Sequence, residues 1–320
     1  MNILMNDQQS NLAFVFPGQG SQSVGMLTNL AENYPEVKHV FEQASDVLSF
    51  DIWKLIQEGP VEALNKTQNT QPIMLAAGVA TWQVWCNQTN SRPQYVAGHS
   101  LGEYTALVAA EALTFEDAIL LVAERGRLMQ EAVPEGIGAM AAILGLTDEQ
   151  VVTICEQTAN GEVVSAVNFN SPGQVVIAGH VGAVDRAMVA AKDAGAKRAL
   201  LLPVSVPSHC ALMEPAANQL AEVLNPIAIN SPKMTLIHNV DAAAHSDTEM
   251  IKSLLKAQLS QPVRWVQTVQ HLQNQEVEHF IECGPGKVLM SLNKRIAKGR
   301  NHLAILDSST LENVLETVND

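Results

Sequence analysis

The chain has 320 residues, of which 47% are hydrophobic, so it is long and apolar enough to bury an extensive core. Its formal net charge of −14 repels phosphate polyanions, which argues against general nucleic-acid binding. The 4 cysteines form no CxxC pair, so the sequence indicates neither a metal site nor a disulfide framework, and we expect reduced thiols.

No segment of the sequence is typical of a secretory signal or of a membrane-spanning helix. Residues 1–11 lack the basic segment, apolar core and cleavage pattern of a secretory signal. The longest apolar stretch, around residues 137–146, is about half of the roughly 20 residues that a membrane-spanning helix needs. We therefore expect no membrane contact and a cytoplasmic location.

The first predicted elements alternate between strand and helix. A buried strand at residues 12–16 leads into a glycine-rich loop at 17–20, and a helix with an apolar stripe follows between residues 37 and 48. Residues 73–86 are apolar nearly all round, as expected of a helix inside a large core. A second strand follows at 95–97. This order indicates an α/β domain.

The order of elements changes after residue 136. We expect, in turn, a strand at 139–144, a helix after the cap at Thr147, strands at 163–169 and 174–178 joined by a tight turn, a helix at 184–194 and a strand at 198–204. This β-α-β-β-α-β order is the ferredoxin-like unit. Further helices and two strands, near 235–239 and 279–282, complete the chain.

The fold prediction is therefore an α/β protein of two parts. A large α/β-hydrolase-like domain with a parallel-rich sheet is discontinuous and comprises residues 1–134 and 206–320. A ferredoxin-like (βαββαβ) subdomain, residues 135–205, is inserted between them.

The sequence GHSLG at residues 98–102 matches the pattern GxSxG. This pattern is informative where a strand meets a helix, because the sharp turn between them exposes the serine hydroxyl. A predicted strand precedes the motif and apolar residues follow it at helical spacing, which argues against a chance match. We predict that Ser100 is a nucleophile at a helix start, whose amides and dipole stabilise an oxyanion. His99 is adjacent to it, and we expect a structural or packing role.

A serine hydroxyl needs a neutral imidazole, which is usually remote in the sequence. Of the 9 histidines, His209 stands out because it follows a predicted strand and begins a helical stretch. A helix start disfavours the imidazolium and keeps the ring available as a base. His238 also ends a predicted strand and is the rival. A hydrogen-bonded structural histidine is the default interpretation at either position.

The loop FPGQGS at residues 16–21 lacks the lysine of a Walker motif and the spacing of GxGxxG. Its glycines let the backbone approach a ligand, so we interpret the Gln19 amide as an oxyanion donor together with the amide of Leu101. An ordinary tight turn is the alternative.

Arg125 falls on the apolar stripe of a predicted helix, three residues after Val122. A buried guanidinium needs an anion. An internal partner such as Asp117 or Glu131 is one answer. The other is a substrate carboxylate bound by the planar fork, which would select acyl groups that carry a free acid.

Five motifs in one order resemble the malonyl-CoA:acyl carrier protein transacylases, and the resemblance spans nearly the whole chain. The motifs are PGQGSQ at 17–22, GHSLGEY at 98–104, ERGRLMQ at 124–130, PSH at 207–209 and GPG at 284–286. Several motifs in one order are far more specific than any one of them.

The resemblance implies roles for individual residues: Ser100 is acylated, His209 is the base, the Gln19 and Leu101 amides hold the oxyanion, Arg125 pairs with the malonyl carboxylate, the backbone carbonyl of Gln258 orients the histidine, and Asn168 lines the pocket. In such enzymes no acidic third member is needed. Ser208, directly before the histidine, resembles the stand-alone fatty-acid type and favours malonyl over methylmalonyl.

The resemblance further implies a ping-pong reaction of fatty acid biosynthesis. Ser100 takes malonyl from malonyl-CoA, and the phosphopantetheine thiol of an acyl carrier protein then attacks the ester. The coenzyme A thioester and the carrier-protein phosphopantetheine are substrates, and no metal or bound cofactor is expected. Lys197 and Arg198 are candidates for contacting carrier-protein acids or coenzyme A phosphates. Basic residues also gather between 287 and 300. Contact with an acidic partner or a phosphate is one explanation, and a solvated helix face is an equally good one.

Three alternatives remain at this point. A serine esterase or thioesterase shares the GxSxG pattern and a distant histidine, and Arg125 discriminates against it. A trans-acting acyltransferase of a polyketide synthase would use the same chemistry with another carrier protein. An inactive scaffold is disfavoured by the intact Ser100 and His209.

Overall fold

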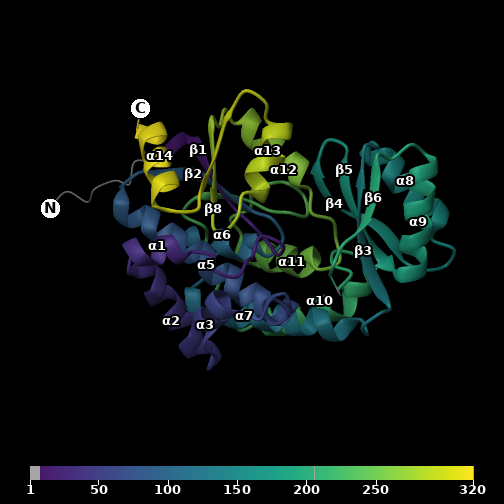
Figure 1. Cartoon of the computed structure of the whole chain (residues 1–320), viewed down its shortest axis with the longest axis horizontal. Helices are drawn as coiled ribbons and strands as arrows, with labels where there is room; N and C mark the ends of the chain where they lie inside the picture. Colours follow the sequence, from purple (N-terminus) through teal and green to yellow (C-terminus); the bar gives the residue numbers. More distant parts are fainter. Residues whose placement is uncertain (1–7, 205, 320) are drawn as a thin grey trace.

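The computed structural model describes residues 8–204 and 206–319, and Figure 1 shows two sheets side by side. In these residues the larger sheet has the order β7-β2-β1-β8-β9, and every neighbouring pair is parallel. Its strands are β1 (Gln8–Phe16), β2 (Arg92–Gly98), β7 (Thr235–Ile237), β8 (His279–Cys283) and β9 (Asn301–Ile305). Parallel strands need crossover connections, which the helices provide.

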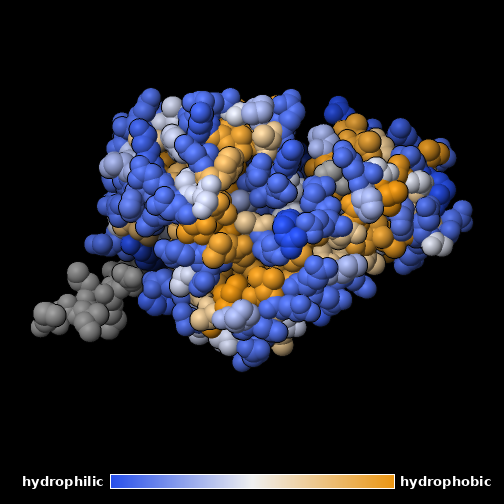
Figure 2. Space-filling view, turned by 90° about the horizontal axis from the view of Figure 1, so that it is seen from below, coloured by the Kyte–Doolittle hydropathy of each residue, from blue (hydrophilic) through white to orange (hydrophobic). Residues whose placement is uncertain are grey.

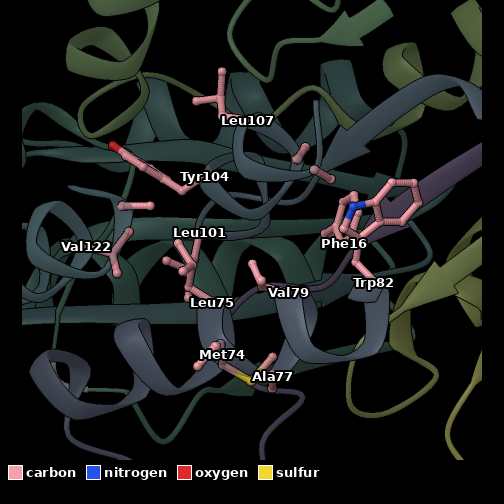
Figure 3. Packing of buried hydrophobic residues seen from close by; sticks show 14 of the residues in the cluster. Phe16, Met74, Leu75, Ala77, Val79, Trp82, Leu101, Tyr104, Leu107 and Val122 are labelled. Atoms are coloured by element: carbon pink, nitrogen blue, oxygen red, sulfur yellow. The ribbon is translucent and has the colours of Figure 1, made fainter. Parts of the chain in front are cut away.

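The helices around this sheet include one that is buried on all sides. They are α1 (Thr28–Asn33), α2 (Glu36–Leu48), α3 (Ile52–Glu58), α4 (Val61–Leu64), α5 (Thr67–Gln88), α6 (Gly102–Ala109), α7 (Phe115–Ala132), the 3-10 turn Ala211–Met213, α10 (Glu214–Leu224), α11 (Thr248–Gln258), α12 (Trp265–Asn274), α13 (Val288–Ile296) and α14 (Ser308–Asn319). Helix α5 contains the predicted 73–86 and begins earlier, at Thr67. Figure 3 shows its Leu75, Val79 and Trp82 packed among Phe16 of β1 and Val122 of α7.

The second sheet has the predicted element order: β3 (Gly138–Leu144), α8 (Asp148–Thr158), β4 (Val164–Ser171), β5 (Gln174–His180), α9 (Val181–Asp193) and β6 (Arg198–Leu201). Its strand order is β4-β5-β3-β6 and all its pairs are antiparallel. Apolar residues of α8 and α9 form a separate core against one face of this sheet. The α/β fold with a parallel sheet and a smaller antiparallel sheet is therefore confirmed.

The end of β6 and the presence of β9 differ from the prediction. Strand β6 ends at Leu201, not at residue 204, because Pro203 has no N–H to donate to a neighbouring strand. Strand β9 was not predicted; it is an edge strand that pairs only with β8 among the described strands, and its short sequence has no distinctive alternation.

The described residues contain no helix that is long and apolar enough to span a membrane. Figure 2 shows apolar side chains in patches among a mainly hydrophilic surface, including patches on the part formed by the second sheet. Two exposed leucines of β6, Leu200 and Leu201, belong to that part.

The turn from β2 into α6 is packed tightly against β1. A Cβ added to Gly98 would lie 1.9 Å from the main-chain carbon of Gly102, and a Cβ added to Gly102 would lie 2.0 Å from the carbonyl oxygen of Phe16. The obstacles are backbone atoms, which cannot rotate away. Only glycine therefore fits at both positions.

We expect Gly102→Ala to lower the free energy of unfolding by about 1–3 kcal/mol, because helix α6 must move away from β1. Urea titration followed by circular dichroism measures this change. Gly182→Ala is the matched control: Gly182 lies in the first turn of α9, where the nearest atoms to an added Cβ are side-chain ends at 3.4 Å or more. That substitution should be neutral or stabilising, and a loss as large as that of Gly102→Ala would contradict our explanation.

Candidate active site

A cavity of about 220 Å³ opens between the two sheets, at the carboxyl ends of β1 and β2. Its polar lining includes Ser100, Arg125 and His209. Met140 and Val176 of the second sheet form part of its wall, and the first residues of α13 form another part. Active sites of parallel sheets typically lie at this edge.

Ser100 occupies a sharp turn directly after β2. Its φ of 52° is in the left-handed region, which is uncommon for a residue with a side chain. The side chain of Asn239 holds this turn from both sides: its Oδ1 accepts from the Ser100 amide at 2.7 Å, and its Nδ2 donates to the Gly98 carbonyl at 2.6 Å. The tight turn and its clamp together fix the position of the hydroxyl.

His209 lies within hydrogen-bond distance of this hydroxyl. Its Nε2 is 2.8 Å from Ser100 Oγ, and its Nδ1 is 2.6 Å from the main-chain carbonyl of Gln258. Because a carbonyl can only accept, the proton of the neutral ring is on Nδ1, and the lone pair of Nε2 faces the serine. Burial, assisted by the positive charge of Arg125, lowers the pKa of His209 to about 3. The imidazole is therefore neutral at physiological pH.

The local context of His209 differs from the prediction. Strand β6 ends at Leu201, and the 3-10 turn Ala211–Met213 that leads into α10 begins two residues after His209, so His209 lies in the irregular segment between them. Its own N–H donates to the Leu259 carbonyl at 2.9 Å. Burial and the positive charge of Arg125 keep the ring neutral.

Arg125 of α7 is almost completely buried, with 1% of its surface exposed. Its Nη1 donates to Gln71 Oε1 at 2.8 Å, and its Nη2 donates to Gln258 Oε1 at 2.9 Å and to Ser100 Oγ at 3.3 Å. The guanidinium thus contacts neutral oxygens and lies beside the serine.

Neither of the internal partners considered for Arg125 contacts it. Asp117 hydrogen-bonds with Thr114, and Glu131 pairs with the exposed Arg127. No described residue bonds to the Nε of Arg125, although this atom is buried. The guanidinium therefore has capacity for an anion that enters the cavity.

Gln19, Leu101 and Asn168 all line the same cavity. Gln19 lies in the loop after β1, and Leu101 directly follows Ser100. Among the hydrogen bonds of the described residues, none uses the main-chain N–H of Gln19 or Leu101. Asn168 pairs with Val176 of β5 directly after a register shift in the pairing of the two strands, and it also forms a bridge with Val263, which ties the second sheet to the segment before α12.

His99 and the basic residues have different surroundings. His99 Nε2 lies 2.8 Å from Asn170 Oδ1, and its ring packs 5.5 Å from that of Trp265, so it has the packing contacts that we expected. Lys197 and Arg198 are exposed, and they are not among the residues that line the cavity. They lie where β6 begins, with Arg198 opposite Leu144 at the end of β3.

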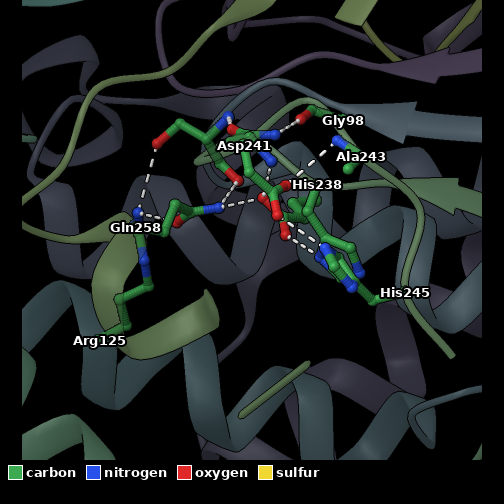
Figure 4. Close-up of polar contacts among 10 residues, drawn as sticks. Gly98, Arg125, His238, Asp241, Ala243, His245 and Gln258 are labelled. Carbon is green, nitrogen blue, oxygen red and sulfur yellow. Dashed lines mark hydrogen bonds and ion pairs between the residues drawn. The ribbon is translucent and has the colours of Figure 1, made fainter. Parts of the chain in front are cut away.

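A buried polar network lies beneath the serine, and sequence analysis missed most of it (Figure 4). His238 does not contact Ser100; its Nδ1 lies 2.7 Å from Glu103 Oε1, and it is fully buried. Glu103 also accepts from the side chain of Gln258 and from the N–H of Asn239. Gln71, which bonds to Arg125, was missed as well.

One signal could have found these residues. Asn239 follows β7 at the sheet edge where active-site groups gather, and Glu103 is a charged residue in α6, whose other residues are uncharged. A polar residue in such a place needs a buried partner.

The described residues contain no group of three or more His, Cys, Asp or Glu side chains that could hold a metal ion. A neutral imidazole on a serine hydroxyl, beside two unbonded amides and a buried guanidinium, can instead perform nucleophilic acyl transfer.

Comparisons with known proteins agree with this chemistry. The sequence matches the family described as Acyl transferase domain over residues 13–305. The malonyl CoA-acyl carrier protein transacylase of Escherichia coli (strain K12) is 54% identical over 307 residues, which cover 96% of this chain and 99% of the relative.

Two solved structures are similar over nearly the whole chain. The acyl carrier protein S-malonyltransferase of Vibrio cholerae is 56% identical with a TM-score of 0.93, over 95% of this chain and 99% of that one. A malonyl-transacylase solved in complex with its type II PKS acyl-carrier protein is 53% identical with a TM-score of 0.94, over 95% and 99%. The chain therefore belongs to the acyl transferase family and, within it, to the malonyl-CoA:acyl carrier protein transacylases.

Proposed function

We propose that the protein transfers a malonyl group from malonyl-CoA to the phosphopantetheine thiol of an acyl carrier protein in fatty acid biosynthesis, through a malonyl ester of Ser100. The observation that carries the proposal is one cavity in which Ser100 Oγ lies 2.8 Å from His209 Nε2 and 3.3 Å from the Arg125 guanidinium. A nucleophile beside its base performs acyl transfer, and a buried cation beside both selects an acyl group with a carboxylate.

In the first half-reaction, Ser100 Oγ attacks the thioester carbonyl while its proton moves to His209 Nε2. The amides of Gln19 and Leu101 bond to the oxyanion that forms. The Gln258 carbonyl accepts from Nδ1 and stabilises the imidazolium. When the carbon–sulfur bond breaks, His209 returns the proton to the leaving sulfur, and free coenzyme A departs.

The second half-reaction reverses these roles. The thiol of phosphopantetheine gives its proton to His209 and attacks the ester carbonyl, and Ser100 Oγ leaves and recovers the proton. The result is a malonyl thioester on the carrier protein and free enzyme. Two successive substrates at one serine give ping-pong kinetics.

Arg125 pairs with the malonyl carboxylate throughout both steps. Gln71 and Gln258 hold the guanidinium through neutral oxygens, so its charge is available to the substrate. Asn168 lines the acyl pocket. These contacts distinguish the protein from an esterase, for which no acyl carboxylate would be required.

A polyketide carrier protein is a second candidate acceptor. The observation that favours it is the similarity to a transacylase solved with a type II PKS acyl-carrier protein. Lys197 and Arg198 are exposed outside the cavity, and we assign to them contacts with carrier-protein acids or coenzyme A phosphates.

Two further assignments belong to this proposal. The boundaries 1–134 and 206–320 for the catalytic domain and 135–205 for the subdomain are supported by the separate hydrophobic core of the second sheet. A cytoplasmic location is supported by the four cysteines, which are all free thiols.

Brief incubation with malonyl-CoA should place one malonyl group on the Ser100 peptide, because Ser100 Oγ lies 2.8 Å from Nε2 of the neutral His209. Peptide mass spectrometry measures this adduct. The adduct should be absent in Ser100→Ala and should form slowly in His209→Ala. Normal acylation of His209→Ala would show that another group is the base.

Arg125→Ala should weaken malonyl transfer by about 1.5–3 kcal/mol, the contribution of a charged hydrogen bond, and should spare acetyl transfer. Values of kcat/KM for malonyl-CoA and acetyl-CoA give the measurement. The matched control is Arg127→Ala, two residues along the same helix, because Arg127 is exposed and pairs with Glu124 and Glu131. An equal loss for both acyl groups in Arg125→Ala would refute the carboxylate role.

The reactivity of Ser100 should change little between about pH 7.5 and about pH 5, because the pKa of His209 lies near 3. A base with the ordinary pKa of about 6.5 would lose about 30-fold over this range. The rate of inactivation by an uncharged sulfonyl fluoride measures the reactivity of the free enzyme. A tenfold fall between these limits would show that His209 is not held neutral.

A further inference from the structure

Gln258 contacts two groups of the site with two different parts of its structure. Its main-chain carbonyl accepts from His209 Nδ1 at 2.6 Å, and its side-chain Oε1 accepts from Arg125 Nη2 at 2.9 Å. The orientation of its side-chain amide therefore decides whether an oxygen or an NH₂ group faces the guanidinium. An NH₂ group in that place would be repelled, because a guanidinium has donors only.

Glu103 fixes this orientation. Gln258 Nε2 lies 2.7 Å from Glu103 Oε2 and 3.0 Å from the main-chain carbonyl of Ser100, and both of these oxygens can only accept. With the nitrogen of the amide held there, the oxygen must point toward Arg125. We propose that Glu103 is a positioning residue for acyl specificity: its carboxylate locks the Gln258 amide, which in turn directs the Arg125 guanidinium at the acyl carboxylate. This proposal rests on the role of Arg125 given above.

The carboxylate of Glu103 is itself held rigidly. It is 1% exposed, and its Oε1 lies 2.7 Å from His238 Nδ1, while its Oε2 also accepts from the N–H of Asn239 at 3.2 Å. These partners come from the end of β7, and Gln258 ends α11. A buried carboxylate with all these donors has one position, so it can transmit that position to its neighbours.

The separation between Glu103 and Arg125 matters for substrate binding. Burial lowers the pKa of Arg125, and the negative charge of Glu103 partly opposes this shift although the Gln258 amide lies between the two groups. A carboxylate in direct contact would form an internal ion pair and occupy the place of the substrate carboxylate. The Gln258 amide thus separates the Glu103 carboxylate from the Arg125 guanidinium, which binds the substrate.

The test compares the ratio of malonyl to acetyl kcat/KM in a set of variants. Glu103→Ala should lower this ratio about tenfold, the effect of misdirecting one charged hydrogen bond. Glu103→Gln should keep the ratio within about twofold, because its amide oxygen still accepts from Gln258 and its NH₂ donates to the other tautomer of His238. Thr105→Ala is the control: Thr105 is the buried neighbour two residues along α6, outside the network, and the ratio should not change.

A second variant covers the case in which Glu103→Ala does not fold. Gln258→Met removes the side-chain amide and keeps the main-chain carbonyl on His209, so it should lower the ratio about tenfold with a smaller effect on acetyl transfer. An unchanged ratio in Gln258→Met, or in a folded Glu103→Ala, would overturn the proposal, as would a Glu103→Gln variant with the ratio of Glu103→Ala.

Arg125→Ala is measured in parallel, to separate this inference from the proposal on which it rests. If Arg125→Ala leaves the ratio unchanged, the carboxylate role of Arg125 fails. If Arg125→Ala lowers the ratio and the Glu103 and Gln258 variants do not, only the positioning role of Glu103 fails. A double variant, Glu103→Ala with Gln258→Met, should lower the ratio no further than Gln258→Met alone, because both act through the same amide.

Discussion

The site depends on one constraint: the Arg125 guanidinium is buried beside His209, and the imidazole of His209 must stay neutral. The arrangement of the other groups satisfies this constraint. Burial lowers the pKa of His209, and the nearby Arg125 guanidinium, 1% exposed, lowers it further. The histidine is oriented by the main-chain carbonyl of Gln258, whereas many serine enzymes use a carboxylate. A carboxylate at that position would lie next to Arg125 and would compete with an acyl carboxylate for it. Neutral oxygens orient both groups without this competition.

The two sheets contribute different parts of the site. The parallel sheet supplies the nucleophile turn and the loop with Gln19 from neighbouring strand ends, while the antiparallel sheet supplies part of the wall that faces them. The contact of His99 with Asn170 and the bridge of Asn168 with Val263 join the two parts close to the cavity. The width of the cavity therefore depends on the contacts that join two parts with separate hydrophobic cores.

Much of this could be predicted from the sequence, because the relevant signals are local. GHSLG between a strand and a helix identifies Ser100, and the element order after residue 136 identifies the second sheet. The network around Glu103 could not be predicted, because its hydrogen bonds join residues far apart: Asn239 and Gln258 lie 136 and 155 positions from Glu103. Strand β9 was missed for a related reason, since its pairing with β8 and not its own composition defines it. His209 was selected by its surroundings in the sequence, yet the irregular segment that holds it depends on the Leu259 carbonyl.

The hydrogen bond from the Ser100 N–H to Asn239 limits which amides can donate to an oxyanion. Because the N–H of Ser100 already donates to Asn239, it is not available to a tetrahedral intermediate, and the two proposed donors come from the ends of different strands, Gln19 after β1 and Leu101 after β2. Their separation is therefore set by the alignment of these strands, in which Phe16 is opposite Gly98. A shift of one residue between the strands would move one donor by about 3.3 Å and turn it toward the other face of the sheet. The pairing of β1 with β2 thus also sets the distance between the two proposed oxyanion donors.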